Sequence, residues 1–273
     1  MSKVVFITGA SSGFGRSCAL HLSALGHRVY GTSRKAGGEG SAADAGFPVL
    51  VGMDVRDEDS VQQALTFVLS REHRIDVVVN NAGSGLAGSV EDTSVEEAEA
   101  LFATNFFGVH RVCRAVLPIM RKQAGGMVVN ISSLGGRVTI PFQGFYSASK
   151  YALEAFTEAL RMETAPFGIK VVMIEPGDFA TGFTAARTFA SASSTDSAYQ
   201  ERCRRAIAVM EHDEQHGADP RKVARLLARI IESRSPRLRY PIGMVGQRTA
   251  VALKRALPAS LIEKALLTYY RIS

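Results

Sequence analysis

The chain has little cysteine and no long apolar run. Its 273 residues include three cysteines, Cys18, Cys113 and Cys203, whose number and wide spacing fit neither a disulfide framework nor a metal site. We therefore expect a reducing compartment, the cytoplasm, and no bound metal. No uninterrupted apolar segment reaches the roughly 18 residues of a membrane-spanning helix, and the short apolar N-terminus does not resemble a signal peptide. These absences argue against a disulfide-rich secreted protein and against an integral membrane protein.

Cys113 could still be a reactive thiol. However, it lies in a helical apolar stripe with Val109, Val112 and Val116, which favours a place in the core.

The net charge of +6 is distributed unevenly along the chain. Residues 220–273 carry 12 lysines and arginines against two glutamates, a net charge of +10, so the first 219 residues carry about −4. Such a segment could contact nucleic acid or, peripherally, an anionic membrane surface. Arg221, Arg225 and Arg229 recur every four residues opposite apolar positions, which favours the solvated face of a helix. Aromatic residues are not interleaved with these cations, so we expect no nucleic-acid partner.

Strand-like and helical patterns alternate along the chain. The pattern predicts strands at 3–8, 27–33, 48–53, 75–80, 126–132, 169–174 and 238–241. Alternation of this kind indicates an α/β fold, a doubly wound, Rossmann-type parallel sheet with helices on both faces. We interpret residues 1–273 as a single dinucleotide-binding catalytic domain.

Four further segments have patterns of their own. Residues 35–47 are rich in glycine, alanine and serine, which predicts a flexible loop. Long helices are expected at about 95–123 and 146–166. The polar segment 182–217 interrupts the alternation and is predicted to be a substrate lid. Residues 242–273 should form a helical extension, with helices at about 246–257 and 259–270, that covers the pocket, a partner subunit or a membrane surface.

A glycine-rich turn directly follows the first predicted strand. The segment reads Thr8-Gly9-Ala10-Ser11-Ser12-Gly13-Phe14-Gly15, and a helical pattern begins at about Arg16. In a dinucleotide site, such glycines allow the turn, the approach of the pyrophosphate and close packing of helix on strand, while the helix N-terminus faces the phosphates. The alternative is a tight turn without a ligand. The predicted cofactor-binding residues here are Gly9, Ser11, Ser12, Gly13, Phe14 and Gly15.

Tyr146 and Lys150 are four residues apart, which places them on one face of a helix. An ammonium group beside a phenol should lower the phenol pKa from about 10 toward neutrality. Such a phenol can give or take a proton during carbonyl reduction or alcohol oxidation. Two serines, Ser132 and Ser133, lie upstream, and either could donate a hydrogen bond to the reacting oxygen.

Taken in order, these motifs resemble those of short-chain dehydrogenases/reductases of the roughly 250-residue branch. The resemblance is carried by the glycine turn at 8–15, Asn-Asn-Ala-Gly at 80–83, Asn105, Ser133, Tyr-x-x-x-Lys at 146–150 and Pro-Gly at 176–177, and it is close over residues 3–181. It selects Ser133 over Ser132. It implies that Tyr146 is the acid or base, that Ser133 fixes the carbonyl oxygen, that Lys150 also binds the nicotinamide ribose, and that Asn105 anchors a water.

The end of the second strand indicates which cofactor is used. NAD-selective sites carry an acid there for the ribose 2′-hydroxyl, but this chain has Ser33 and then Arg34. A guanidinium suits a 2′-phosphate, so we expect NADP(H) and consider NAD less favoured. Alternatively, Arg34 points to solvent or stacks on adenine, which would leave NAD possible. By resemblance, further cofactor contacts are Asp54, Val55, Asn81, Ala82, Gly83, Tyr146, Lys150, Pro176, Gly177 and Thr181; the role of Asp178 is open.

The substrate is predicted to be a hydrophobic ketone, aldehyde or secondary alcohol. The expected pocket residues are Ser133, Gly135, Phe142, Tyr146 and Phe183, an arrangement similar to hydroxysteroid and retinol dehydrogenases. Two alternatives are a non-catalytic dinucleotide sensor or scaffold on the same fold and an epimerase or dehydratase with internal redox chemistry. The resemblance also implies a homodimer or homotetramer formed through the two long helices.

Overall fold

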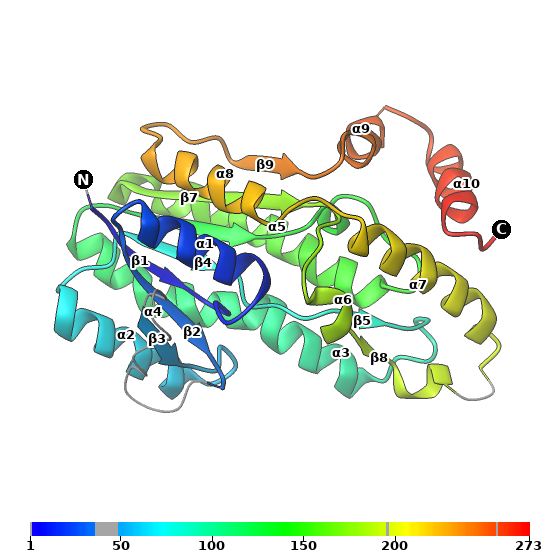
Figure 1. The fold of residues 1–273 in the computed structure, drawn as a ribbon, viewed down its shortest axis with the longest axis horizontal. Coiled ribbons are helices and arrows are strands. Elements are labelled where there is room, and N and C mark those ends of the chain that lie inside the picture. Colours follow the sequence, from blue (N-terminus) through cyan, green and yellow to red (C-terminus); the bar gives the residue numbers. More distant parts are fainter. Residues whose placement is uncertain (1, 36–48, 195–196, 255) are drawn as a thin grey trace.

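A computed structural model describes residues 2–35, 49–194, 197–254 and 256–273 (Figure 1). The loop predicted at 35–47 falls almost entirely outside the described residues, as does residue 48 of the predicted third strand.

The centre of the molecule is a parallel sheet of seven strands. Its order is β3 (Val49–Gly52), β2 (Arg28–Ser33), β1 (Val4–Ile7), β4 (Val77–Asn80), β6 (Gly126–Ile131), β7 (Ile169–Pro176) and β9 (Arg239–Ile242). Each of these strands coincides with a predicted one, and the doubly wound fold class is confirmed. The register places Val5 of β1 beside Val29 and Val77 on the two neighbouring strands, so the centre of the sheet is apolar on both faces.

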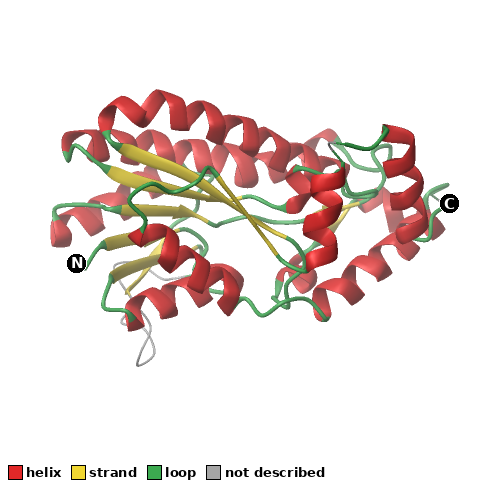
Figure 2. Ribbon diagram, turned by 90° about the horizontal axis from the view of Figure 1, so that it is seen from above, coloured by secondary structure: helices red, strands yellow, loops and turns green. Residues whose placement is uncertain are grey.

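Helices cover both faces of the sheet (Figure 2). On one face, α1 (Gly13–Ala24) and α8 (Arg221–Glu232) pack against alternate strand residues. On the other face lie α2 (Glu58–Glu72), α4 (Gly108–Lys122) and α5 (Gly144–Thr164). Cys113 is buried within this second layer, where burial raises the pKa of its thiol to about 12, in agreement with a core role.

The charged stripe on α8 faces outward. Arg221, Arg225 and Arg229 are exposed, while Val223, Leu227 and Ile230 and their apolar neighbours are buried against α1. The solvated-face interpretation of this stripe is therefore confirmed.

The long helix predicted at 95–123 is not uniform. It begins as α3 (Val95–Phe102), widens into a π-helical turn over Ala103–Phe107 and continues as α4. A capping box between Ser94 and Glu97 fixes its start. The π-helical turn is centred on Asn105, and such turns often mark functional positions because they interrupt the regular pattern of backbone hydrogen bonds.

The segment 182–217, predicted to be a substrate lid, contains several regular elements. It forms α6 (Phe183–Ala186), the short strand β8 (Thr188–Phe189), a 3₁₀ turn at Ser191–Ser194 and α7 (Gln200–Gln215). β8 pairs in parallel with β5 (Leu86–Ala87), which ties the segment to the loop after β4. In the sequence, α7 could have been recognised from apolar residues at helical spacing. These residues, which the structure buries, are Cys203, Ala206, Ile207 and Met210.

The C-terminal residues form the two predicted helices, α9 (Val245–Leu253) and α10 (Ala259–Tyr269). Ile272 is buried against the apolar stripe of α7, with Leu267 and Tyr270 beside it. The extension therefore packs against the lid segment. Among the residues that the structure describes, no helix is both long and apolar enough to cross a membrane.

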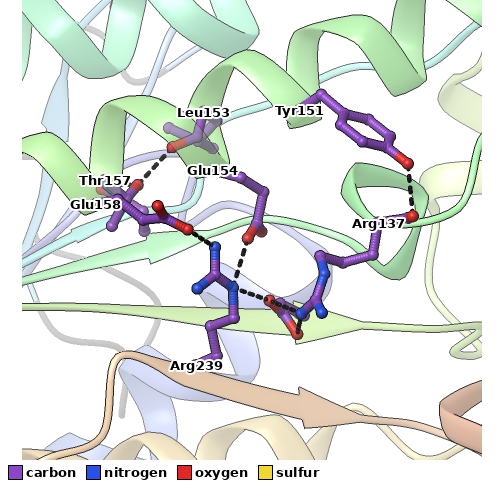
Figure 3. A network of polar contacts seen from close by, with 9 residues as sticks. Arg137, Tyr151, Leu153, Glu154, Thr157, Glu158 and Arg239 are labelled. Carbon is purple, nitrogen blue, oxygen red and sulfur yellow. Dashed lines mark hydrogen bonds and ion pairs between the residues drawn. The ribbon is translucent and has the colours of Figure 1, made fainter. Parts of the chain in front are cut away.

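A buried cluster of charges fixes α5 against the sheet (Figure 3). The Arg239 Nε atom on β9 lies 3.0 Å from Glu154 Oε2 on α5 and 3.1 Å from Glu175 Oε1 on β7. Arg137 approaches Glu175 to 3.1 Å, and Arg239 also pairs with Glu158. Glu175 is fully buried, and among the residues that the structure describes its charge is compensated by these two guanidinium groups.

The cluster contains three carboxyl groups and two guanidinium groups, so one proton on a carboxyl group would balance its charge. Burial, together with the nearby charge of Glu175, raises the pKa of Glu154 to about 7. Near neutral pH, Glu154 is therefore the member of the cluster that can take up a proton.

We predict that Glu154→Gln removes a pH dependence of stability. The folded-state pKa of Glu154 lies above the unfolded value, so the native state binds more protons between the two values. The wild type should therefore lose unfolding free energy, at most about 3 kcal/mol, as pH rises from 5 to 8. The glutamine cannot ionise and should not show this loss. Urea denaturation at several pH values measures both; Glu163→Gln, at an exposed carboxylate of α5 outside the cluster, should follow the wild type. Parallel curves for wild type and Glu154→Gln would contradict the prediction.

A second prediction concerns the packing of α1 on the glycine turn. A Cβ atom on Gly15 would lie 2.5 Å from Asn81 Nδ2 and would clash with the Gly9 carbonyl oxygen. Gly15→Ala should therefore reduce the unfolding free energy by roughly 2 kcal/mol. Gly246 in α9 has open space around it, so Gly246→Ala is the matched control and should not destabilise the fold. Equal urea midpoints for the two variants would show that the turn can relax around a methyl group.

Candidate active site

The predicted site residues meet at the carboxyl edge of the sheet. Thr8 follows β1, Asn81 follows β4 and Ser133 follows β6, while Tyr146 and Lys150 lie in the first two turns of α5. In a parallel sheet all these strands end at the same edge, which is where open α/β folds bind their ligands. Residues that are far apart in the sequence are thereby gathered around one region.

The loops after β1 and β4 are joined by hydrogen bonds. The Thr8 hydroxyl accepts from the backbone N–H of Asn81 at 3.0 Å and of Ala82 at 2.9 Å. The Asn81 side chain donates to the carbonyl oxygens of Thr8 and Gly9. Gly9 has a φ of +65°, and a Cβ atom there would lie 2.9 Å from Ala82 Cα. The turn is thus built around glycine and cannot accept a side chain without moving.

The N-terminus of α1 can accept an anionic group. Its N-cap residue, Ser12, makes no side-chain capping bond, and the first turn carries no acidic residue. Ser11 and Ser12 are exposed, and the space beside Gly13 extends to Thr181 at 3.9 Å from a built Cβ atom. Free backbone N–H groups at a helix N-terminus suit a pyrophosphate. These residues therefore fit a dinucleotide. The side chain of Phe14, another predicted cofactor contact, packs against the Phe179 ring, with the two ring centroids 5.1 Å apart.

The end of β2 carries the residues expected to select the cofactor. Ser33 is buried, and its hydroxyl accepts from the Lys35 backbone N–H at 3.2 Å, whereas Arg34 is exposed. Asp54 pairs with Arg56 at 2.6 Å. Hydrogen bonding to Arg56 holds the pKa of Asp54 below its usual value, and the positive charge of Arg34 acts in the same direction. Arg34 therefore lies near Asp54, at the edge of the sheet where the adenosine end would bind.

Ser133 and Tyr146 are close neighbours. A Cβ atom built on Gly135 would lie 3.2 Å from Ser133 Oγ and 3.3 Å from Tyr146 Cε1, so the glycine separates the two side chains narrowly. The Gly135 backbone N–H donates to Ser133 Oγ at 2.9 Å. Ser132 lies on the other side of this loop, toward the buried charge cluster. The side chains of Ser132 and Glu154 both lie beside Gly136. The choice of Ser133 over Ser132 thus agrees with the geometry.

The pKa expected for Tyr146 is wrong. Burial raises the pKa of this phenol to about 12, and a side-chain hydrogen bond with Ser133 opposes that increase only in part. The Lys150 ammonium lies 5.9 Å from the Tyr146 ring centroid and donates to the Ile131 carbonyl oxygen at 3.0 Å. Its hydrogen bond is therefore made to the strand and not to the phenol. Burial lowers the pKa of Lys150 to about 8. At neutral pH the phenol carries its proton.

Asn105 joins the loop after β4 to α5. Its Nδ2 atom donates to the Ser84 carbonyl oxygen at 3.0 Å and to Ser149 Oγ at 3.2 Å, and its Oδ1 atom accepts from the Ser84 N–H at 2.9 Å. A Cβ atom on Gly83 would meet both Asn105 Oδ1 and Lys150 Nζ within 3.8 Å. The π-helical turn thus places Asn105 beside the lysine, with its side-chain amide fully engaged.

The side chains packed around Tyr146 differ in part from those predicted to line the substrate pocket. Phe183 lies against Tyr146, with ring centroids 5.8 Å apart, and Leu86, Leu101 and Phe145 complete an apolar cluster around them. Phe142 instead packs with the buried stripe of α7, away from this cluster. Its proposed substrate contact therefore has no support from its packing, whereas that of Phe183 does.

Sequence reasoning missed several polar residues of the wall. Arg187 is buried and pairs with Glu214 of α7, and Asp178 accepts a hydrogen bond from Gln247. The negative charges of Glu214 and Asp178 raise the pKa of Tyr146 and the positive charge of Arg187 lowers it, so all three lie near the phenol. Only Asp178 stood out in the sequence, because it directly follows the Pro-Gly pair.

Comparison with known proteins agrees with this geometry. A family model described as short chain dehydrogenase matches residues 3–191. The 3-ketodihydrosphingosine reductase of Bacteroides thetaiotaomicron is 42% identical over 270 residues, which are 99% of this chain and 98% of that protein. The crystal structure of a short-chain dehydrogenase from Streptomyces avermitilis superposes with a TM-score of 0.83 at 34% identity, covering 99% of this chain and 97% of that one.

A short chain dehydrogenase/reductase from Burkholderia phymatum, solved in complex with NAD, superposes with a TM-score of 0.77 at 25% identity and covers 97% of this chain and 95% of that one. The family match spans most of the chain, and relatives align over nearly all of it. The protein therefore belongs to the short chain dehydrogenase family and is an oxidoreductase.

Proposed function

We propose that this protein is an NADP(H)-dependent reductase of a hydrophobic carbonyl compound, with Tyr146 as the proton donor. The observation that carries the proposal is the buried, protonated phenol of Tyr146 beside the Ser133 hydroxyl, at the sheet edge that also presents the glycine turn. A hydride acceptor placed between them would meet a proton donor and a hydrogen-bond donor together.

The dinucleotide, when bound, supplies a hydride to the carbonyl carbon. Negative charge then grows on the carbonyl oxygen, and the Ser133 hydroxyl can stabilise it by a hydrogen bond while the Tyr146 phenol gives up its proton. The raised pKa of Tyr146 keeps that proton in place until an alkoxide, a much stronger base, forms beside it.

Lys150 and Asn105 support the same step. The ammonium of Lys150 is buried close to Tyr146, so its positive charge would stabilise the phenolate left after proton transfer. Asn105 holds the loop at Gly83 and Ser84 against α5 and so maintains the space beside the lysine. We assign both residues to the site, with Lys150 also placed to bind the nicotinamide ribose.

The substrate is proposed to be a long-chain ketone. The apolar residues around Tyr146, namely Leu86, Leu101, Phe145 and Phe183, provide a surface for an alkyl group. The relative from B. thetaiotaomicron is named for the reduction of 3-ketodihydrosphingosine, a long-chain ketone with an amino group on the carbon next to the carbonyl and a hydroxyl group beyond it. Its full-length similarity makes this compound a suitable first substrate to test.

NADP(H) is proposed on the chemistry of the β2 end. Ser33 and Arg34 occupy the position where an acidic residue would bind a ribose 2′-hydroxyl, and Arg34 is exposed and free to meet a 2′-phosphate. The relative from B. phymatum is described as a complex with NAD, so related chains can use either dinucleotide.

The long helices α4 and α5 are proposed to form a homo-oligomer interface, because several large apolar side chains on and beside them are exposed, namely Phe107, Tyr151, Met162 and Phe167.

We predict that Tyr146→Phe abolishes reduction but not cofactor binding. Loss of the phenolic proton should lower kcat by roughly 10²- to 10⁴-fold. NADPH binding, followed by nicotinamide fluorescence, should change little. Tyr151→Phe on the same helix is the control, because the Tyr151 hydroxyl contacts the Arg137 carbonyl oxygen at the surface, away from Ser133. Turnover by Tyr146→Phe at the wild-type rate would remove this residue from the mechanism.

We further predict that Arg34→Asp reverses the cofactor preference. Loss of a charge-assisted contact to the 2′-phosphate, and repulsion by the new carboxylate, should lower the ratio of kcat/KM for NADPH over NADH by roughly tenfold or more. The exposed Lys122 at the end of α4 provides a charge-matched control, Lys122→Asp, whose ratio should stay at the wild-type value. An unchanged ratio in Arg34→Asp would show that the Arg34 guanidinium of the wild type points to solvent and does not contact the 2′-phosphate.

A further inference from the structure

The lid segment buries an arginine whose donors are only partly used. Arg187 follows α6, is 5% exposed, and directs Nη2 to Glu214 on α7. Its Nε and Nη1 atoms are buried without a hydrogen-bond partner among the described residues. An unpaired guanidinium N–H in the interior is costly, because its hydrogen bonds to water are lost and not replaced. These donors therefore call for an acceptor that the chain itself does not supply.

This arginine stands beside the reactive phenol. Its guanidinium lies 6.0 Å from the centre of the Phe183 ring, and that ring lies 5.8 Å from the Tyr146 ring. A Cβ atom on Gly85 would meet both Phe183 and Arg187, so the glycine makes room for the pair. The free donors of Arg187 thus lie one aromatic ring away from the place where a carbonyl would be reduced.

Carboxylates outnumber cations around Arg187. Asp178 follows β7, and Asp213 and Glu214 lie at the end of α7. Burial raises the pKa of Asp178 to about 6, and the charges of Glu214 and Asp213 add to the increase, which places the three carboxylates within each other's field. Arg187 is the opposing charge that acts on Asp178. The wall therefore carries a surplus of negative charge next to Tyr146.

The hydrogen bonds made by these carboxylates do not neutralise the surplus. Thr184 donates its hydroxyl to Glu214 at 2.5 Å, Tyr269 donates to Asp213, and Gln247 donates its amide to Asp178. All three donors are uncharged. A cation placed here would gain from the field of the carboxylates, whereas an anion would be repelled except at the free edge of Arg187.

We propose that Asp178, Arg187 and Glu214, together called the head-group cluster, bind the polar end of an amino ketone bearing a hydroxyl group. The ammonium group lies beside the carboxylates of Asp178 and Glu214, and the hydroxyl oxygen accepts hydrogen bonds from Arg187. The keto oxygen then faces Ser133 and Tyr146, and the alkyl chain follows the apolar residues around Phe183. This inference rests on the proposed carbonyl reduction at Tyr146 and adds the group that selects the substrate.

The chemistry of the cluster also explains its mixed charge. A purely acidic wall would bind any amine, and a lone arginine would favour carboxylates or phosphates. A site with both donors and acceptors prefers a ligand that presents an ammonium and an oxygen at a fixed spacing, because a ligand lacking one of them leaves a buried group unpaired.

The test compares two substrates that differ only at the polar end. 3-Ketodihydrosphingosine and a 3-ketone of the same chain length without amino and hydroxyl groups are reduced with NADPH in mixed detergent micelles. The wild type should show a kcat/KM at least tenfold higher for the amino ketone. Glu214→Gln should lower this ratio by roughly tenfold, because only the amino ketone has an ammonium group for the carboxylate to bind.

Controls separate recognition from folding. Glu201→Gln makes the same chemical change on an exposed face of α7 and should keep the wild-type ratio. Asp178→Asn provides a second variant at the cluster in case Glu214→Gln does not fold, as judged by circular dichroism. Arg187→Lys keeps the positive charge but removes the fork of N–H donors, and it should lower the ratio as well.

The outcomes distinguish this inference from the proposed function. Equal kcat/KM for the two ketones in the wild type, or a parallel loss for both in Glu214→Gln, would overturn the head-group cluster and leave carbonyl reduction intact. If neither ketone is reduced while NADPH binds, the long-chain ketone assignment fails and the inference fails with it.

Discussion

The hydrogen bond from the Lys150 ammonium to the Ile131 carbonyl oxygen fixes where α5 stands against the sheet. It joins the helix that carries Tyr146 to the end of the strand that leads to Ser133, so the distance between those two side chains is set by this contact and by Gly135 between them. One turn further along α5, the Glu154 carboxyl group meets Arg239 and fastens the same helix to β7 and β9. The position of the phenol is thus determined by buried polar contacts on its own helix.

The same burial that holds α5 decides the chemistry of the phenol. A lysine one helical turn away suggests an acidified tyrosine when only the sequence spacing is considered. In the folded chain, the phenolate form loses more stabilisation by leaving water than it gains from nearby groups. The pKa of Tyr146 therefore rises. Desolvation also lowers the pKa of Lys150, because burial disfavours an ammonium as it disfavours a phenolate. Both shifts follow from the dry environment, which spacing in the sequence does not reveal.

Features with a local signal could be predicted from the sequence, and features made by distant pairs could not. Most of the seven strands could be predicted from short apolar runs, and the glycine turn, Ser133 and Tyr146 lie just after strands or near the start of a helix. The partners of Glu175, by contrast, are Arg137 and Arg239, which are distant from it in the sequence. Nothing in the sequence around either arginine distinguishes it from an arginine on the surface. The helix α7 was not predicted from the sequence, because its apolar stripe is short and is surrounded by charged residues.

The two buried charge clusters differ in a way that separates support from recognition. Around Glu175, every guanidinium group faces a carboxyl group, and one proton on Glu154 balances the whole, so this cluster has no need of a ligand. Around Arg187, the carboxylates of Asp178 and Glu214 are partly exposed, and two donor atoms of the buried guanidinium have no partner among the described residues. A fold tolerates such an imbalance when a ligand completes it, because the cost of the unpaired groups is then recovered on binding. The cluster beside Tyr146 is therefore the one that a substrate would complete, and the cluster behind α5 is the one that keeps the helix in place.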